Sequence, residues 1–284
     1  MDPLQKSVLA RSPLGFHRMA YTEWGRDAGG GTVVCVHGLT RNGRDFDALA
    51  ADLAGRARVV CPDVVGRGAS DWLAQPALYG YPQYLADMAV LLARLDVPEV
   101  TWVGTSMGGL IGMLLAADPK SPIKRLVVND VGPFIPKAAL ERIGGYVGKD
   151  PDFADEAEAE AYLRGVLAGF GRLSDAQWGH MARHSVRRKA SGALGLAYDP
   201  GIGAAFTGQP IPDVDLWPVW DAIRCPVLVL RGSSSDLLLA ETAEEMTRRG
   251  PPARRVEIPD AGHAPALMAP DQIAVVRDFL FDHG

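Results

Sequence analysis

One short stretch of the sequence, Gly104-Thr105-Ser106-Met107-Gly108, has the spacing of a nucleophilic serine on a sharp turn. An apolar, β-branched run at 100–103 precedes it and a longer apolar run at 110–115 follows, which predicts a strand before the turn and a helix after it. In this G-x-S-x-G arrangement the turn forces the serine into an unfavourable conformation, and the glycines have no Cβ to collide with it. We therefore predict that the Ser106 hydroxyl is exposed at the edge of a sheet, at the positive end of a helix.

A neutral serine hydroxyl needs a base to take its proton, and the base needs a carboxylate to orient it. Asp236 follows a predicted strand at 226–232, and His263 follows another at 254–258. The chain order Ser, Asp, His is the one that accompanies this kind of turn, and the carboxyl ends of parallel strands meet at one edge of a sheet. We predict a catalytic triad of Ser106, Asp236 and His263.

Other polar residues have less demanding interpretations. Asp260 is close to His263 in sequence, but a turn carboxylate is the expected role. His180 and His184 have the i, i+4 spacing that can bind a metal, yet no Glu follows His180 as a zinc peptidase would need. We expect them to be surface histidines, and we predict neither a metal nor an organic cofactor.

The elements that must position these residues alternate between strands and helices. A loosely alternating segment at 14–24 predicts an antiparallel edge strand, and near-continuous apolar runs at 32–36, 58–63 and 125–130 predict strands buried on both faces. Apolar residues between 84 and 95 recur at helical spacing. The alternation predicts an α/β fold with a mostly parallel sheet and helices on both faces.

This alternation stops between 134 and 214, where helices are expected over 155–170 and 174–189 but no buried strand. We interpret this segment as a helical lid inserted between two parts of the core, at 1–133 and 215–284. Substrate-pocket candidates near the lid are Thr40, Phe134, Trp178 and Met181.

The composition excludes several classes of function. A net charge of −5 over 284 residues gives no support for binding to nucleic acid or to an anionic membrane. No run of 18 apolar residues is present, and the first residues lack the pattern of a secretion signal. We expect a cytoplasmic protein with a small-molecule substrate; the sequence does not indicate an oligomeric state.

Several landmarks in order give the chain a resemblance to the α/β-hydrolase superfamily: His37-Gly38, the segment 66–71, the serine turn, the segment 232–236 and the segment 260–263. The resemblance implies an eight-stranded sheet. It also implies an oxyanion hole made by the backbone N–H groups of Leu39 and Met107, with His37 as a structural residue. Some members take the acid from the strand that ends at Asp130, so Asp130 is the alternative to Asp236.

The serine narrows the chemistry that this resemblance implies, because the dehalogenases and epoxide hydrolases of the superfamily carry Asp at the same turn. We predict a serine esterase or lactonase that acts on a small to medium, apolar substrate through an acyl-enzyme. The alternatives are hydrolysis of a C–C bond in a vinylogous diketone, a perhydrolase side activity, and a non-catalytic small-molecule receptor.

Overall fold

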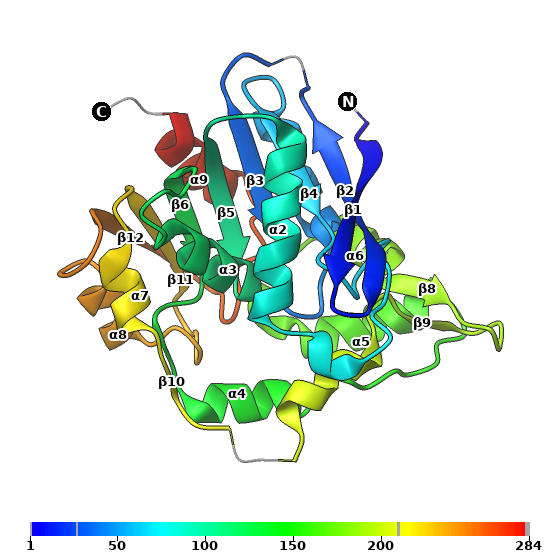
Figure 1. Ribbon diagram of the computed structural model, residues 1–284. Coiled ribbons are helices and arrows are strands. Elements are labelled where there is room, and N and C mark those ends of the chain that lie inside the picture. The colour runs from blue at the N-terminus through cyan, green and yellow to red at the C-terminus, as the bar shows by residue number, and fades with distance from the viewer. Residues whose placement is uncertain (1, 27, 209–210, 282–284) are drawn as a thin grey trace.

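The computed structural model describes residues 2–26, 28–208 and 211–281, and eight of the strands in this part of the chain form one sheet (Figure 1). Neighbouring strands are parallel from β4 onward, whereas β1 and β2 are antiparallel at one edge. The predicted fold class is confirmed. The strands, in their order across the sheet, are β1 (Leu4–Ser12), β2 (Gly15–Trp24), β4 (Arg58–Pro62), β3 (Thr32–Val36), β5 (Val100–Thr105), β6 (Ile123–Asn129), β11 (Val227–Gly232) and β12 (Ala253–Ile258).

The edge of the sheet differs from the expectation. The segment predicted as the edge strand is β2, and β1 pairs along its whole length on the outside. The sequence of β1 mixes polar residues such as Lys6, Ser7 and Arg11 with a few apolar ones, and most of its side chains are at least partly exposed. An outer strand with so little buried surface leaves only a weak alternation to detect.

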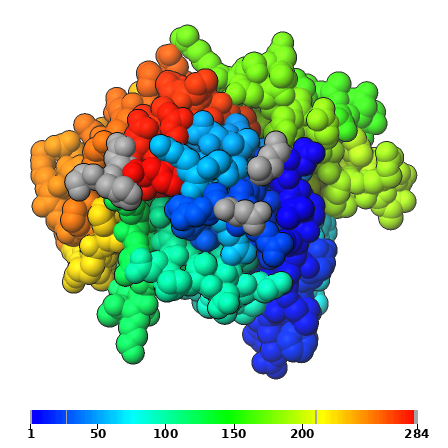
Figure 2. All heavy atoms as spheres, turned by 90° about the horizontal axis from the view of Figure 1, so that it is seen from above, coloured from blue at the N-terminus to red at the C-terminus, as the bar shows by residue number. Residues whose placement is uncertain are grey.

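The two faces of the sheet are covered by different helices, as the alternation of side chains along each strand requires. Val34 and Val36 of β3 pack on the face that carries α2 (Tyr81–Leu95) and α3 (Met107–Ala116). Val33 and Cys35 of the same strand pack on the other face, against α1 (Asp47–Leu53) and α9 (Pro270–Phe281). Figure 2 shows red α9 beside the light-blue segment around α1. Two shorter helices, α7 (Trp217–Ala222) and α8 (Ala240–Glu245), extend the first face.

The segment expected to form a lid begins and ends in a short antiparallel ribbon, β7 (Phe134–Ile135) paired with β10 (Val214–Asp215). The helices between them are α4 (Lys137–Gly144), α5 (Glu156–Val166) and α6 (Asp175–Ser185). In Figure 1 α4 and α5 lie below the sheet, where the parallel strands end. The segment therefore leaves and rejoins the core at one place.

Both helices expected in the inserted segment are shorter than predicted. The first, α5, ends at Val166, and a separate 3-10 turn covers 168–170. A capping box of Ser174 and Gln177 starts α6, but the helix ends at Ser185 and not at 189. The next residues form β8 (Val186–Arg188), which pairs with β9 (Leu194–Leu196) around a turn with Gly192 at φ +91°. The basic run that suggested a helix C-terminus is thus part of a small hairpin.

Two glycines in helices should respond in opposite ways to substitution by alanine. A Cβ at Gly112 would lie 2.5 Å from Cδ1 of Trp102, a fully buried ring, whereas a Cβ at Gly165 would meet nothing within 4 Å. We expect Gly112→Ala to lower the free energy of unfolding by about 1–3 kcal/mol through overpacking. Gly165→Ala should raise it by up to about 1 kcal/mol through helix propensity. Urea unfolding of both variants checks this, and a Gly112→Ala protein as stable as the wild type would contradict it.

Candidate active site

The turn between β5 and α3 has the steric character that the glycine spacing requires. Ser106 has φ 52° and ψ −116°, a region that side chains rarely occupy. A Cβ on Gly108 would lie 2.0 Å from the carbonyl oxygen of Val36 in β3, so only glycine allows the helix to start this close to the sheet. Strain of this kind costs on the order of 1–3 kcal/mol and persists only where the surrounding structure fixes it.

A chain of hydrogen bonds links Ser106, His263 and Asp130. His263 Nε2 is 2.9 Å from Ser106 Oγ, and His263 Nδ1 is 2.8 Å from Asp130 Oδ2. The carboxylate can only accept from Nδ1, so the neutral ring carries its proton there and leaves Nε2 free to accept the serine proton. This is the relation of nucleophile, base and orienting acid that acyl transfer needs.

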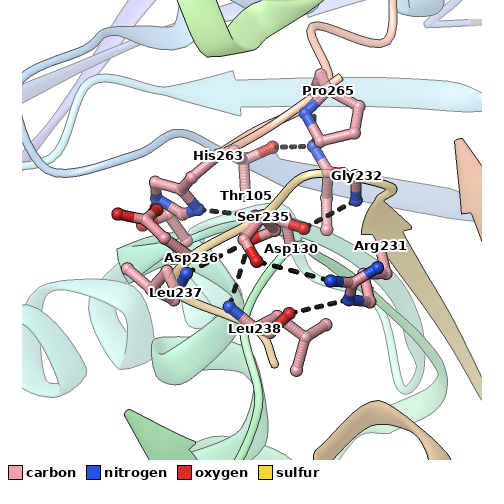
Figure 3. A network of polar contacts seen from close by, with 12 residues as sticks. Thr105, Asp130, Arg231, Gly232, Ser235, Asp236, Leu237, Leu238, His263 and Pro265 are labelled. Atoms are coloured by element: carbon pink, nitrogen blue, oxygen red, sulfur yellow. Dashed lines mark hydrogen bonds and ion pairs between the residues drawn. The ribbon is translucent and has the colours of Figure 1, made fainter. Parts of the chain in front are cut away.

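The Asp130 carboxylate is fully buried and is held by donors from a neighbouring strand (Figure 3). The Gly232 N–H donates to Oδ1 at 2.7 Å, and the Ser235 hydroxyl donates to Oδ2 at 2.6 Å. Together with His263, these groups satisfy the carboxylate without water. They hold both carboxylate oxygens in place and point Oδ2 at the histidine ring.

His37 fixes the loop that faces Ser106. Its Nδ1 donates to the carbonyl oxygen of Gly38 at 2.7 Å, and its Nε2 accepts from the Val64 N–H at 2.9 Å. Burial lowers the pKa of His37 to about 3, so the ring is neutral and both of its nitrogens are engaged. The Gly38 carbonyl belongs to the same peptide group as the Leu39 N–H. His37 therefore sets the direction of that N–H, in keeping with the structural role expected for it.

Two cavities meet at Ser106. An apolar cavity of about 340 Å³ is bounded by Ser106, Met107 and Leu39, and by aliphatic and aromatic side chains that include Ile143 and Phe206. A smaller cavity, of about 60 Å³, lies on the His263 side. It is lined partly by apolar side chains, but unlike the first cavity it also has charged ones. We call it the polar cavity; its polar lining residues are His37, Thr40, Arg41, Asp45, Thr105, Arg142 and Tyr146, along with the serine and histidine. The serine thus has an apolar and a polar neighbourhood.

Comparison with known proteins assigns the family. A family model described as the alpha/beta hydrolase fold matches residues 31–270. The chain belongs to the α/β-hydrolase family.

Individual hydrolases match over most of the chain. The 3-hydroxybutyrate-oligomer hydrolase of Cupriavidus necator is 50% identical over 277 residues, 94% of each chain. The 2-(acetamidomethylene)succinate hydrolase of Mesorhizobium japonicum is 27% identical and covers 87% of this chain and 86% of its own. A crystal structure of an α/β-hydrolase from Novosphingobium aromaticivorans has a TM-score of 0.87 and 38% identity, with 98% of both chains covered. The predicted family and the predicted class, a hydrolase of carboxylic esters, are confirmed.

The structure corrects the expected partner of His263 in this α/β-hydrolase. Asp236 is half-exposed and forms a bidentate ion pair with Arg142 of α4, with Nε–Oδ2 and Nη2–Oδ1 distances of 2.5 and 2.8 Å. The alternative, Asp130, is the carboxylate that meets the ring. Chain order could not distinguish the two, because Asp130 and Asp236 both lie between Ser106 and His263 in the sequence. Both also follow strands that end at the same edge of the sheet. Ser235, the residue before Asp236, donates a hydrogen bond from its hydroxyl to Asp130.

The hydrolase has the two expected oxyanion-hole residues beside the serine. Leu39 lines both cavities, and Met107 starts α3, where the first N–H groups of a helix have no acceptor within the helix. A buried guanidinium that the sequence did not single out supports the Leu39 loop. Arg67 donates from Nε to the Leu39 carbonyl oxygen at 2.8 Å and from Nη1 to the Tyr84 hydroxyl at 3.1 Å. In the sequence, the only feature that could have singled out Arg67 is its position between Gly66 and Gly68.

Three of the four residues predicted to line the substrate pocket lie outside both cavities at Ser106. Thr40 lines the polar cavity, whereas Phe134, Trp178 and Met181 are not among the described residues that line either cavity at the serine. Trp178 and Met181 are buried within the lid, and Arg164 stacks over the Trp178 ring at 5.4 Å. The helical spacing of apolar residues predicts that such a side chain is buried. It does not distinguish packing within the protein from contact with a substrate.

The histidine pair of the lid faces the core. His180 and His184 lie near Asp47, and their potential ligand atoms are within 4.8 Å of one another. However, the Arg44 guanidinium donates to both carboxylate oxygens of Asp47. A cation at this place would have to displace that guanidinium, so we assign the hydrolase no metal there.

The buried neutral His37 makes stability depend on pH. Its pKa is about 3 when folded and 6.5 in the unfolded chain, so the unfolded state binds the proton more readily. As pH falls from 6.5 toward 3, the wild type should lose up to about 1.4 kcal/mol of unfolding free energy per pH unit relative to His37→Gln. Asp63, whose pKa burial raises to about 6, is present in both proteins and cancels in the difference.

Urea unfolding of the two proteins at several pH values measures this difference. Parallel pH profiles would contradict a buried neutral His37.

Proposed function

We propose that this chain is a serine hydrolase that cleaves short oligoesters of hydroxy acids, with oligomers of 3-hydroxybutyrate as the first substrates to test. The observation that carries the proposal is the hydrogen-bonded chain of Ser106, His263 and Asp130 at the junction of two cavities. The 50% identity to a 3-hydroxybutyrate-oligomer hydrolase supports the choice of substrate class.

In the proposed mechanism Ser106 Oγ attacks the ester carbonyl while His263 Nε2 takes its proton, and Asp130 stabilises the resulting imidazolium. The backbone N–H groups of Leu39 and Met107 would stabilise the oxyanion, by about 3–4 kcal/mol each. His263 then returns the proton to the leaving alcohol. Water hydrolyses the acyl-enzyme with His263 again as the base. None of these steps uses a metal or an organic cofactor.

The other interpretations of the sequence have no specific observation in their favour. C–C bond hydrolysis would use the same three residues, and a receptor would not need the aligned base and acid.

Among the helices of the described residues, none has the length and hydropathy of a membrane span. A cytoplasmic location stays a prediction from the sequence.

Removal of the nucleophile should abolish turnover without unfolding the protein. We expect Ser106→Ala to lower kcat for p-nitrophenyl butyrate by roughly 10⁴-fold or more. It should also lose labelling by a fluorophosphonate probe. Ser191→Ala, in the exposed β8–β9 turn, is the matched control and should keep both. An unlabelled wild type would favour the receptor interpretation, and a labelled Ser106→Ala would place the nucleophile elsewhere.

Two aspartate variants distinguish the possible acids. Asp130→Asn should lower kcat by roughly 10⁴-fold, because an amide can neither hold the reactive tautomer nor stabilise the imidazolium. Asp236→Asn removes a half-exposed ion pair and should lower kcat for p-nitrophenyl butyrate less than tenfold. If the Asp236 variant were the slower one, the acid would be the residue that chain order first suggested.

A further inference from the structure

We propose that the polar cavity beside Ser106 is the subsite for the leaving part of the ester, and that Arg142 binds a carboxylate on that leaving part. The inference rests on the proposed function and makes it more specific: the enzyme would release hydroxy-acid units from the carboxylate end of an oligoester.

The position of the base decides which cavity holds which part of the ester. The leaving oxygen has to receive its proton from His263 Nε2, so the leaving part must lie on the histidine side of the serine. The polar cavity is lined by His263 and by the three residues that follow it, 264–266, whereas none of these four lines the apolar cavity. The acyl part then occupies the larger apolar cavity, next to the oxyanion-hole residues.

The charges in the two cavities differ. No charged side chain of the described residues lines the apolar cavity. The polar cavity has two guanidinium groups, Arg41 and Arg142, and one carboxylate, Asp45. Arg41 is buried and spends Nε and Nη2 on both oxygens of Asp45, at 2.8 and 2.7 Å. These two charges compensate each other within the cavity. The carboxylate that pairs with Arg142, Asp236, does not line the cavity, so Arg142 is the one cation among the described lining residues whose counter-charge lies outside it.

Arg142 has donors left for a ligand. It contacts Asp236 through Nε and Nη2, the same two atoms that Arg41 uses, and among the described residues Nη1 has no hydrogen-bond partner. What sets Arg142 apart is its half-exposed side chain, which can turn toward a ligand, whereas Arg41 is buried. Asp236 is itself half-exposed and does not line the cavity, so the pair is solvated on its outer side while Arg142 borders the cavity. Tyr146 lines the same cavity, and burial raises the pKa of its phenol, which therefore stays protonated and can donate.

The chemistry of an oligoester fits this division. At the last ester bond the leaving part is a single hydroxy acid, which carries a hydroxyl at one end and a free carboxylate at the other. Attack by Ser106 forms the acyl–Oγ bond and breaks the acyl–oxygen bond, and His263 gives its proton to the departing alkoxide. One unit leaves with its carboxylate near Arg142, and the rest of the chain stays on the serine until water releases it. The smaller volume on the polar side agrees with a short leaving part.

Two dimers and three proteins test the subsite. The substrates are the 3-hydroxybutyrate dimer as its free acid and the same dimer with a terminal primary amide. For the wild type, kcat/KM should be roughly tenfold or more higher for the acid, because a charge-assisted hydrogen bond is lost in the amide. Arg142→Gln should bring this ratio close to one. Lys137→Gln removes the same charge from the same helix, outside both cavities, and should keep the wild-type ratio.

A trimer with an isotopic label in its carboxyl-terminal unit gives a second measurement, which needs no variant. The label should appear first in the monomer. A label that remains in the dimer product would overturn the assignment of the two cavities.

Two results with the dimers would overturn the role of Arg142. One is an acid-to-amide ratio of kcat/KM near one in the wild type, and the other is an unchanged ratio in Arg142→Gln. None of these results would contradict the proposed ester hydrolysis by Ser106. If neither dimer is cleaved while p-nitrophenyl butyrate still is, the oligoester function itself fails, and the subsite with it.

Discussion

A carboxylate that is fully out of water has to be held by hydrogen-bond donors, since the cost of burying an unpaired charge is several kcal/mol. Asp130 meets this requirement with donors from three places in the chain: the end of β11, the loop after it, and His263. Its neighbour Asn129 adds two more links, to Thr105 before the serine and to the carbonyl of Pro265 after the histidine. The end of β6 therefore joins the segments that carry Ser106, His263 and Asp130, the proposed nucleophile, base and acid.

The lid is attached to this same region. Arg142 of α4 contacts Asp236, and the residue before Asp236 is the serine that donates to the buried acid. Arg142 of the inserted segment and the carboxylate of Asp130 are thus held by consecutive residues of one loop, Asp236 and Ser235. Whatever binds at Arg142 does so at a fixed place relative to the reacting atoms, because the loop between them is short and its serine is bound.

The sequence predicted the features that depend on local sterics and on the order of strands. The glycines around Ser106 and the position of His263 follow from spacing that the backbone enforces, whereas the structural role of His37 was implied by the resemblance to the superfamily. The choice between Asp130 and Asp236 could not be predicted, because it depends on which of two adjacent strand ends directs its side chain at the ring. Trp178 and Met181 were misplaced for a related reason. Apolar spacing indicates that a helix has a buried face, but the packing of the lid decides what covers that face.

The paired strands β7 and β10 give the inserted segment its ends at a single place on the core. The chain between them closes a loop whose entropic cost grows only with the logarithm of its length. Insertions or deletions within that loop therefore add little entropic cost, provided that the ribbon is kept. A segment grafted from another hydrolase at these two strands would still have to replace contacts with the core, among them the Arg142–Asp236 ion pair and the Gly169 carbonyl that accepts from the Gly262 N–H, beside His263.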